Sequence, residues 1–189
     1  MRATILDSVG ANSPLCPGLS ENLRAFLDQK GIECHVLELD HLNILPCVGC
    51  EGCLRKTPGM CVMKDDTRVL VNELAVSHWI VGITQMRFGG YSAQLKKVVD
   101  KFALLASPFY YVHKRKLLHP PRYGCQQLLM VVGLGWHFAE ETHNFSLLVR
   151  NNAMNLSIDA WLAPVFPSGS ISEKVVSGIG QELERRGFL

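Results

Sequence analysis

Four cysteines gather in one short segment of the sequence, residues 46–66, which reads PCVGCEGCLRKTPGMCVMKDD. Their spacing is C-x2-C-x2-C-x7-C, and they are Cys47, Cys50, Cys53 and Cys61. Thiols only two residues apart can converge on one centre. The glycines between them let the backbone curl tightly, because glycine tolerates positive φ. Converging thiolates suit a soft metal ion or an iron–sulfur cluster.

Four interpretations of this segment compete. A [4Fe–4S] cluster takes four thiolates, and a compact C-x2-C-x2-C run with a remote fourth cysteine is a usual arrangement for one, so we favour it. Four reduced cysteines without a ligand come second. A structural zinc site comes third, since it normally uses two well-separated C-x2-C pairs and the second pair is missing here. A dithiol redox pair comes last, because it would use only two of the four thiols.

Length and composition limit the class of protein. The chain has 189 residues, 48% of them hydrophobic and 19% charged, which is typical of globular material and predicts a single domain over residues 1–189. A net charge of +2 without a long basic run predicts no nucleic-acid partner. No signal peptide and no apolar run of roughly 20 residues is present, so no membrane partner is expected. Seven cysteines then indicate reduced thiols in the cytoplasm.

Apolar patterning predicts strands that alternate with helices. The expected strands are residues 2–6, 33–39, 79–83, 128–132 and 158–165. The expected helices are residues 19–30, a helix capped by Asp65 or Asp66, a helix capped by Ser92, and residues 140–156 and 172–186. Residues 107–124, which contain three prolines, form an excursion that we interpret as a lid or an interface arm.

This alternation predicts an α/β fold with a five-stranded parallel sheet. In such sheets ligands bind beyond the carboxyl ends of the strands. Three loops leave those ends after the first, third and fourth strands, namely residues 7–18, 84–92 and 133–140. The cysteine loop follows the second strand, so we expect it at the same edge, within electron-transfer reach of a ligand bound there.

The order of elements resembles the flavodoxin-like fold, a three-layer sandwich. The cysteine run, together with Lys64-Asp65-Asp66, Phe88-Gly89-Gly90-Tyr91-Ser92-Ala93-Gln94-Leu95-Lys96 and Asp100-Lys101, resembles the iron–sulfur flavoproteins. These belong to the wider group of NAD(P)H-dependent FMN reductases. The resemblance extends over residues 2–165 by motif order. It implies FMN held by three loops, a [4Fe–4S] cluster on the four cysteines, and homodimers or homotetramers in which a cluster faces a neighbour's flavin.

The resemblance also implies roles for individual residues. The first loop would hold the FMN phosphate, the second would follow the isoalloxazine ring, and the third would flank the ring. The residues implied are Ser8, Asn12, Ser13, Ser20, Thr84, Gln85, Met86, Arg87, Phe88, Gly89, Gly90, Tyr91, Gly135 and Trp136. The first loop departs from the family pattern because it lacks an arginine and begins with Asp7, whose charge must point away from a phosphate.

Two functions of different classes follow. The first is an FMN oxidoreductase that takes electrons from NAD(P)H or ferredoxin and passes them to a small acceptor such as oxygen, peroxide or a quinone. No catalytic acid, base or nucleophile is evident in the sequence, because the cofactors carry the chemistry. The alternative is a flavin-free, flavodoxin-like binding or scaffold protein that uses the cysteines for structural zinc.

Overall fold

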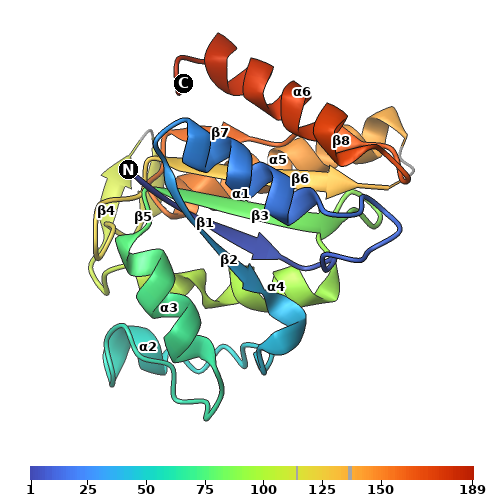
Figure 1. Cartoon of the computed structure of the whole chain (residues 1–189). Coiled ribbons are helices and arrows are strands. Elements are labelled where there is room, and N and C mark those ends of the chain that lie inside the picture. The colour runs from blue at the N-terminus through green and yellow to red at the C-terminus, as the bar shows by residue number, and fades with distance from the viewer. Residues whose placement is uncertain (114, 136–137) are drawn as a thin grey trace.

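The structure is a computed structural model of the chain and describes residues 1–113, 115–135 and 138–189. Its centre is a parallel sheet with the strand order β2-β1-β3-β6-β7 (Figure 1). The bounds are β1 (Arg2–Asp7), β2 (Glu33–Glu38), β3 (Trp79–Gln85), β6 (Leu128–Leu134) and β7 (Ala160–Leu162). Strands β1, β3 and β6 are almost wholly buried, which explains their continuous apolar character. The flavodoxin-like strand order is confirmed.

The fifth strand differs from the expectation of one run over residues 158–165. It consists of β7 and a separate β8 (Val165–Phe166), and both pieces pair with β6. Pro164 lies between them and has no N–H to donate to a ladder, although its carbonyl accepts a hydrogen bond from the Gly133 amide. The strand therefore breaks at the proline and resumes beside the end of β6.

Helices cover both faces of the sheet. On one face, α1 (Leu19–Gln29) and α6 (Ser172–Arg185) bury leucine, valine and isoleucine side chains against β1, β3 and β6. On the other face lie α3 (Thr67–Val76), α4 (Ala93–Val99), the 3-10 helix η2 (Asp100–Leu105) and α5 (Ala139–Asn155). Figure 1 shows α6 and α1 above the sheet and α3 and α4 below it. The chain thus forms three layers.

The excursion and the cysteine segment, for which no helix or strand was predicted, both contain short ones. The excursion over residues 107–124 holds an antiparallel hairpin, β4 (Tyr111–His113) with β5 (Lys116–Leu118). The cysteine segment follows the 3-10 helix η1 (Leu39–His41) and contains a four-residue helix, α2 (Gly52–Arg55). Neither element has enough residues to produce a recognisable apolar period.

The cysteine loop does not stay at the carboxyl edge of the sheet. After β2 and η1 the chain runs beneath α3, and α2 lies at the end of the molecule away from loop 8–18 (Figure 1). There the loop meets η2, the part of the α4–η2 segment that is farthest from the sheet edge. The expectation that the cysteines share the edge with the other three loops is therefore wrong.

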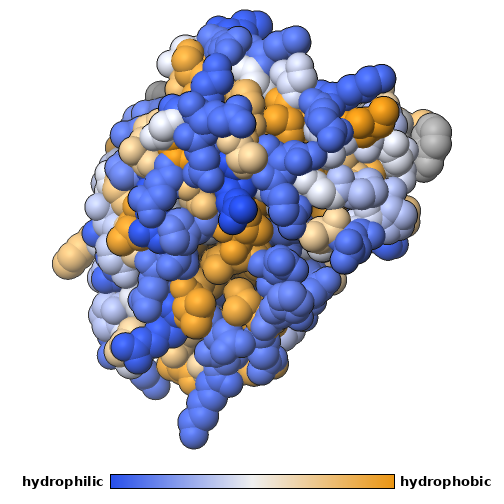
Figure 2. Space-filling model, viewed as in Figure 1, coloured by the Kyte–Doolittle hydropathy of each residue, from blue (hydrophilic) through white to orange (hydrophobic). Residues whose placement is uncertain are grey.

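The surface viewed in Figure 2 is mostly hydrophilic, with an apolar area near its middle, in the region where Figure 1 draws β2 and α3. Strand β2 is an edge strand of the sheet, and its Val36 and Leu37 are only half-buried. Among the helices that the structure describes, none is long and apolar enough to cross a membrane.

Candidate functional site

The four cysteines of the motif line one pocket between the cysteine loop and η2. Its apolar walls include Val48, Val62, Met63 and Leu104, and its volume is about 30 Å³. Cys47 and Cys50 are exposed at its solvent side, whereas Cys53 and Cys61 are partly buried. In the described part of the chain no three ligating side chains already have metal-binding geometry. By its chemistry the donor set fits an iron–sulfur cluster, because four soft thiols line the same pocket.

Local backbone geometry brings the thiols together. Gly49 has φ of 65° and Glu51 has φ of 53°, so the chain turns twice through the left-handed region before α2 begins. Gly52 is needed for a different reason. A Cβ on this residue would lie 2.8 Å from Cγ1 of Val62, so a larger residue would push the Val62 side chain away from α2.

The four thiols also interact electrostatically. Burial raises the pKa of the Cys53 thiol, and the three neighbouring cysteines raise it further because their thiolates would repel a fourth. A cation at the centre removes this repulsion. Since ligand thiols must lose their protons, metal binding at this loop should release protons.

Two aspartates close the base of the loop. The Asp65 carboxylate accepts hydrogen bonds from the amides of Leu45, at 2.9 Å, and Thr67, at 3.1 Å. The Asp66 carboxylate accepts one from the amide of Asn43, at 2.8 Å. The segments before Cys47 and after Cys61 are therefore held together. Of the two predicted capping residues, Asp66 occupies the N-cap position of α3 but its side chain makes no capping bond among the described residues, whereas Asp65 accepts the amide of Thr67, the first residue of the helix.

A buried lysine lies behind the fourth cysteine. Nζ of Lys101, on η2, lies 3.3 Å from Sγ of Cys61 and 3.5 Å from Oδ2 of Asp65. The side chains of Lys101 and Asp65 are 2% and 0% exposed. Burial opposes the charge on Lys101, but Cys61 and Asp65 together raise its pKa. Burial likewise opposes the Asp65 charge, yet its hydrogen bonds and Lys101 lower its pKa.

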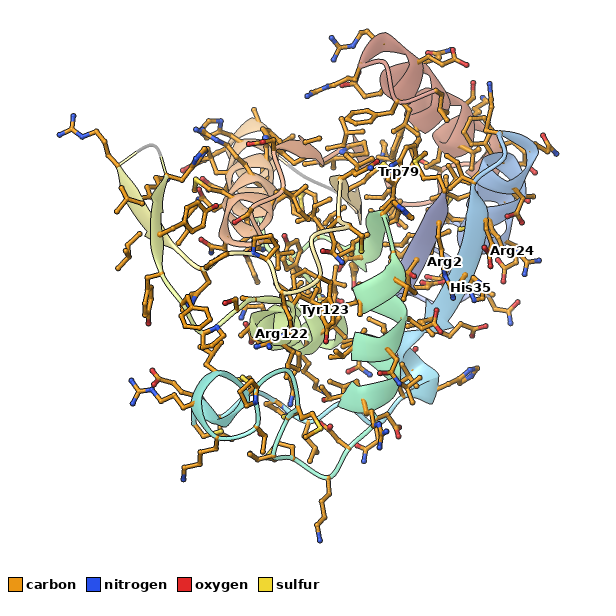
Figure 3. The ribbon with its side chains drawn as sticks, turned by 90° about the vertical axis from the view of Figure 1, so that its left-hand side faces the viewer. Arg2, Arg24, His35, Trp79, Arg122 and Tyr123 are labelled. Carbon is orange, nitrogen blue, oxygen red and sulfur yellow. The ribbon has the colours of Figure 1, made fainter. Side chains whose placement is uncertain are left out.

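The excursion returns to the cysteine loop at its far end. Figure 3 shows Arg122 and Tyr123 above the ribbon of this loop. A Cβ on Gly59 would lie 3.3 Å from Nε of Arg122, and Tyr123 borders a cavity of about 500 Å³ together with Pro58 and Met60. Arg122 is anchored by its own amide, which donates to Leu105, and by a guanidinium bond to Ala106. Residues 121–123 therefore cover one side of the loop.

The first loop after β1 uses part of its backbone internally. The buried Asp7 carboxylate accepts the amides of Val9, at 2.9 Å, and Gly10, at 3.0 Å. Its charge is thus directed into the loop's own turn, as a nearby phosphate requires. Ser8 is also buried, and its hydroxyl bonds to the carbonyl of Ile83 and to the hydroxyl of Ser92.

The first loop leads into the N-terminus of α1. Gly18 precedes the helix with φ of 69°, and among the residues that the structure describes no side chain caps the first amides. Uncapped amides at a helix N-terminus attract anions. Asn12 is exposed nearby in sequence, and the Ser13 hydroxyl accepts the amide of Leu15. Ser20 is buried and donates to Glu21, so its side chain faces inward.

The loop after β3 presents backbone groups rather than side chains. Arg87 and Gly90 close a tight turn through two mutual backbone hydrogen bonds of 3.1 and 2.8 Å. Within the described residues, the amides of Phe88 and Gly89 at the turn have no hydrogen-bond partner. Phe88 is 94% exposed and has φ of 51°. Two free amides beside an exposed aromatic ring fit the polar edge of a flavin.

The remaining side chains of this loop have structural contacts. Thr84, Met86 and Tyr91 are buried. The Thr84 hydroxyl accepts the amide of Ser92, and the Tyr91 hydroxyl accepts a hydrogen bond from Asn152 at 2.9 Å. Burial raises the pKa of Tyr91 to about 12. Gln85 binds the Arg87 guanidinium through its Oε1.

The third loop, after β6, lies beside the second. The amide of Met86 donates to the carbonyl of Leu134, and Gly135 donates to Phe166. The predicted residue Trp136, and His137 beside it, lie outside the described residues. The structure thus brings the three predicted flavin loops to one edge of the sheet and the four cysteines to another place.

Comparison with known proteins gives the family. A profile of NADPH-dependent FMN reductases matches residues 5–133, which is more than half of the chain. The chain belongs to this family. The match includes the first two flavin loops, the cysteine loop and Lys101, and it ends before the broken fifth strand of this FMN reductase family member.

Two relatives of the chain are named iron–sulfur flavoproteins. An iron–sulfur flavoprotein of Methanocaldococcus jannaschii is 33% identical over 73 residues, 39% of this chain and 37% of that protein. An iron–sulfur flavoprotein of Archaeoglobus fulgidus is 34% identical over 92 residues, 49% of this chain and 46% of that protein. The chain therefore matches less than half the length of either relative.

Solved structures support the fold of this FMN reductase family member. An NAD(P)H:quinone oxidoreductase from Methanothermobacter marburgensis superposes with a TM-score of 0.68 at 14% identity, covering 98% of both chains. An FMN-dependent NADH-azoreductase from Bacillus anthracis, in complex with FMN, gives 0.61 at 9% identity, covering 98% of this chain and 96% of the other. At these identities the likeness shows the flavodoxin-like fold alone.

Sequence reasoning missed Lys101 as part of the site. It appeared only as a fragment of the family resemblance, because forty positions separate it from Cys61. The available signal was a lysine close to the apolar residues Val98, Val99 and Phe102 of the predicted helical stripe. A charge at that place requires a buried partner.

Proposed function

We propose that this FMN reductase family member is an FMN-dependent oxidoreductase that also holds a [4Fe–4S] cluster on Cys47, Cys50, Cys53 and Cys61. The observation that supports it most is the convergence of these four thiols on one pocket, with a buried cation beside one of them. When bound, the cluster and FMN supply one-electron and two-electron redox chemistry. The names of the two archaeal relatives agree with this combination.

The chain's own residues bind and orient the flavin in this proposal. The uncapped amides of α1 receive the phosphate, with Asn12 and Ser13 beside it. The free amides of Phe88 and Gly89 donate to the polar edge of the ring, and the exposed Phe88 ring covers part of it. The Ser8–Ser92 contact keeps these two loops at a fixed separation.

We further propose that the complete redox unit contains two or more copies of the chain. Lys101, beside Cys61, lies nine positions after Ser92, beside the flavin loops, which is about 14 Å along a helix. Both ends carry exposed apolar side chains, Val48, Met60 and Val62 at the cysteines and Phe88 at the flavin loops. Association of copies would cover these side chains and bring the cysteines of one copy to the flavin of the next.

Electrons enter from NAD(P)H or from a reduced ferredoxin in this account, and a small acceptor such as oxygen, peroxide or a quinone receives them. The flavin edge suits a hydride donor because it is open and its backbone is fixed by the Arg87–Gly90 turn. The exposed Cys47 and Cys50 suit a one-electron protein donor, since they leave the cluster close to the surface.

Anaerobic reduction tests the proposed function. FMN-loaded protein is mixed with NADH, NADPH or reduced ferredoxin, and the flavin absorbance is followed before and after a quinone is added. We expect bleaching by at least one donor and recovery with the quinone. In Cys47→Ser/Cys50→Ser, reduction by ferredoxin should be lost, whereas Cys125→Ser, outside the loop, should retain it. A flavin that no donor reduces would contradict the oxidoreductase proposal.

A further inference from the structure

A positive charge is buried directly against one of the four motif cysteines. The Lys101 side chain is 2% exposed, and its Nζ lies 3.3 Å from Sγ of Cys61. Burying an ammonium group costs several kcal/mol unless hydrogen bonds and an opposite charge compensate it. Its partners in the structure are the Cys61 sulfur and the Asp65 carboxylate, so this cation is kept where it can act on the sulfur.

The lysine has little freedom to move away. Asp65 is 0% exposed in its side chain and is held by the amides of Leu45 and Thr67, which close the base of the cysteine loop. Lys101 itself projects from η2, whose residues Asp100 to Leu104 form one wall of the cysteine pocket. The Lys101 ammonium is therefore held in contact with both the Asp65 carboxylate and the Cys61 sulfur.

Two other lysines close in sequence are not buried as Lys101 is. Lys64 is part of the same loop but is exposed. Lys96, one turn earlier on α4, pairs with Asp100 at the surface. Exposed charges act weakly because water and salt screen them, whereas a buried charge next to a ligand acts strongly. Lys64 therefore serves as a matched control for Lys101.

We propose that Lys101 is a positioning residue for the metal centre, which donates an N–H···S hydrogen bond to Cys61 and offsets the negative charge of the four thiolates. This inference rests on the proposed function in naming a cluster, but its geometry concerns the thiolates of this chain. Hydrogen bonds to the sulfurs and nearby charge set the potential of an iron–sulfur centre. Reduction adds negative charge, so a fixed cation favours the reduced form and raises the potential.

Redox titration of the loaded protein tests this role. In Lys101→Met, the reduced-to-oxidised ratio at a fixed ambient potential should fall at least tenfold, which is 59 mV for a one-electron couple. Lys101→Arg, which keeps the charge, should recover most of the shift. Lys64→Met should change the ratio less than twofold. Equal ratios for the wild type and Lys101→Met, or equal shifts for Lys101→Met and Lys64→Met, would overturn the proposal.

Two further measurements keep the test decisive if Lys101→Met does not fold or if the protein takes up no iron. If Lys101→Met does not fold, Lys101→Met/Asp65→Asn removes both buried charges and is compared with Asp65→Asn, because loss of the carboxylate by itself raises the potential. The reduced-to-oxidised ratio of the double variant should be at least tenfold below that of Asp65→Asn, and equal ratios in the two would overturn the proposal.

If the wild type takes up no iron, the iron–sulfur function fails. The affinity of the four thiolates for cobalt(II) then tests the role of Lys101 independently of a cluster. A cobalt affinity at least tenfold weaker in Lys101→Met than in Lys64→Met supports the role, and equal affinities overturn it.

Discussion

The hydroxyl oxygens of Ser8 and Ser92 lie 2.8 Å apart, although 84 positions separate the two residues in the sequence. Ser8 begins the loop after β1, and Ser92 ends the loop after β3. The Ser92 hydroxyl also accepts the amide of Leu95 at the start of α4. One side chain therefore caps a helix and joins two of the loops proposed to bind FMN.

Replacement of Ser92 by alanine should weaken both the fold and flavin binding. Loss of the cap should lower the free energy of unfolding by about 1 kcal/mol, because the Leu95 amide loses its partner. Urea unfolding measures this change, and FMN titration by fluorescence quenching measures the binding. Ser177→Ala, at an exposed position inside α6, should leave FMN binding unchanged and raise the free energy of unfolding by a few tenths of a kcal/mol, because alanine favours a helix more than serine does. Equal stability of the two variants would mean that the Ser92 cap contributes nothing.

The buried pair Lys101–Asp65 should contribute far more to stability than a surface pair on the same segment. Asp65→Asn leaves the ammonium uncompensated and should lower the free energy of unfolding of metal-free protein by about 3 kcal/mol. Asp100→Asn removes the exposed pair with Lys96 and should cost less than about 1 kcal/mol. Urea unfolding of both variants checks this order, and an equal loss in both would show that burial of the pair has no consequence.

Phe88 should matter for the flavin and not for the fold. Because its side chain is 94% exposed, Phe88→Ala should change the free energy of unfolding by less than about 0.5 kcal/mol. Loss of ring contact should raise the Kd for FMN about fivefold to tenfold. Phe109→Ala is the matched control, since Phe109 is 72% exposed on the excursion and away from the flavin loops. Unchanged FMN affinity in Phe88→Ala would remove this residue from the site.

Helix α6 should show a specific dependence on pH. Hydrogen bonds from Arg185, and then from Arg186, lower the pKa of Glu182 from 4.5 to about 2. A carboxylate with a lowered pKa stabilises the folded state above its unfolded pKa and loses that contribution as the pH falls through the folded pKa. The wild type should therefore be more stable to unfolding than Glu182→Gln at neutral pH, by less than about 1 kcal/mol because the pair is exposed. This difference in stability should decline as the pH falls from 4.5 to about 2. Thermal melts across this range measure it, and a gap independent of pH would contradict the assignment.

Much of the fold could be read from the sequence because its strands are nearly continuous apolar runs. Trp79 to Ile83 and Leu128 to Val132 are buried on both sides, which leaves few alternatives to a central parallel strand. The break at Pro164 was also visible in principle, since proline cannot donate in a ladder. The hairpin over residues 111–118 carried no such signal, because its exposed Val112 and Leu117 break the alternation expected of a half-buried strand.

The site was less accessible to sequence reasoning. The cysteine spacing pointed to a common centre, and the structure gathers the four thiols at one pocket. Their place in the molecule was predicted wrongly, because the segment between β2 and α3 is long enough to return beneath the sheet. A lysine beside Val98, Val99 and Phe102 was visible in the sequence, but the sequence did not show which groups it contacts. Its partners are brought to it by the packing of η2 against the loop, which is a tertiary property.

Metal and flavin analysis of anaerobically prepared protein tests the central claim most directly. Iron, acid-labile sulfide, zinc and FMN are counted per chain in the wild type, in Cys53→Ser and in Cys125→Ser. The account predicts about four irons with about four sulfides and about one FMN in the wild type and in Cys125→Ser, with the iron lost in Cys53→Ser. About one zinc per chain without sulfide, or FMN with no metal on the four cysteines, would contradict it.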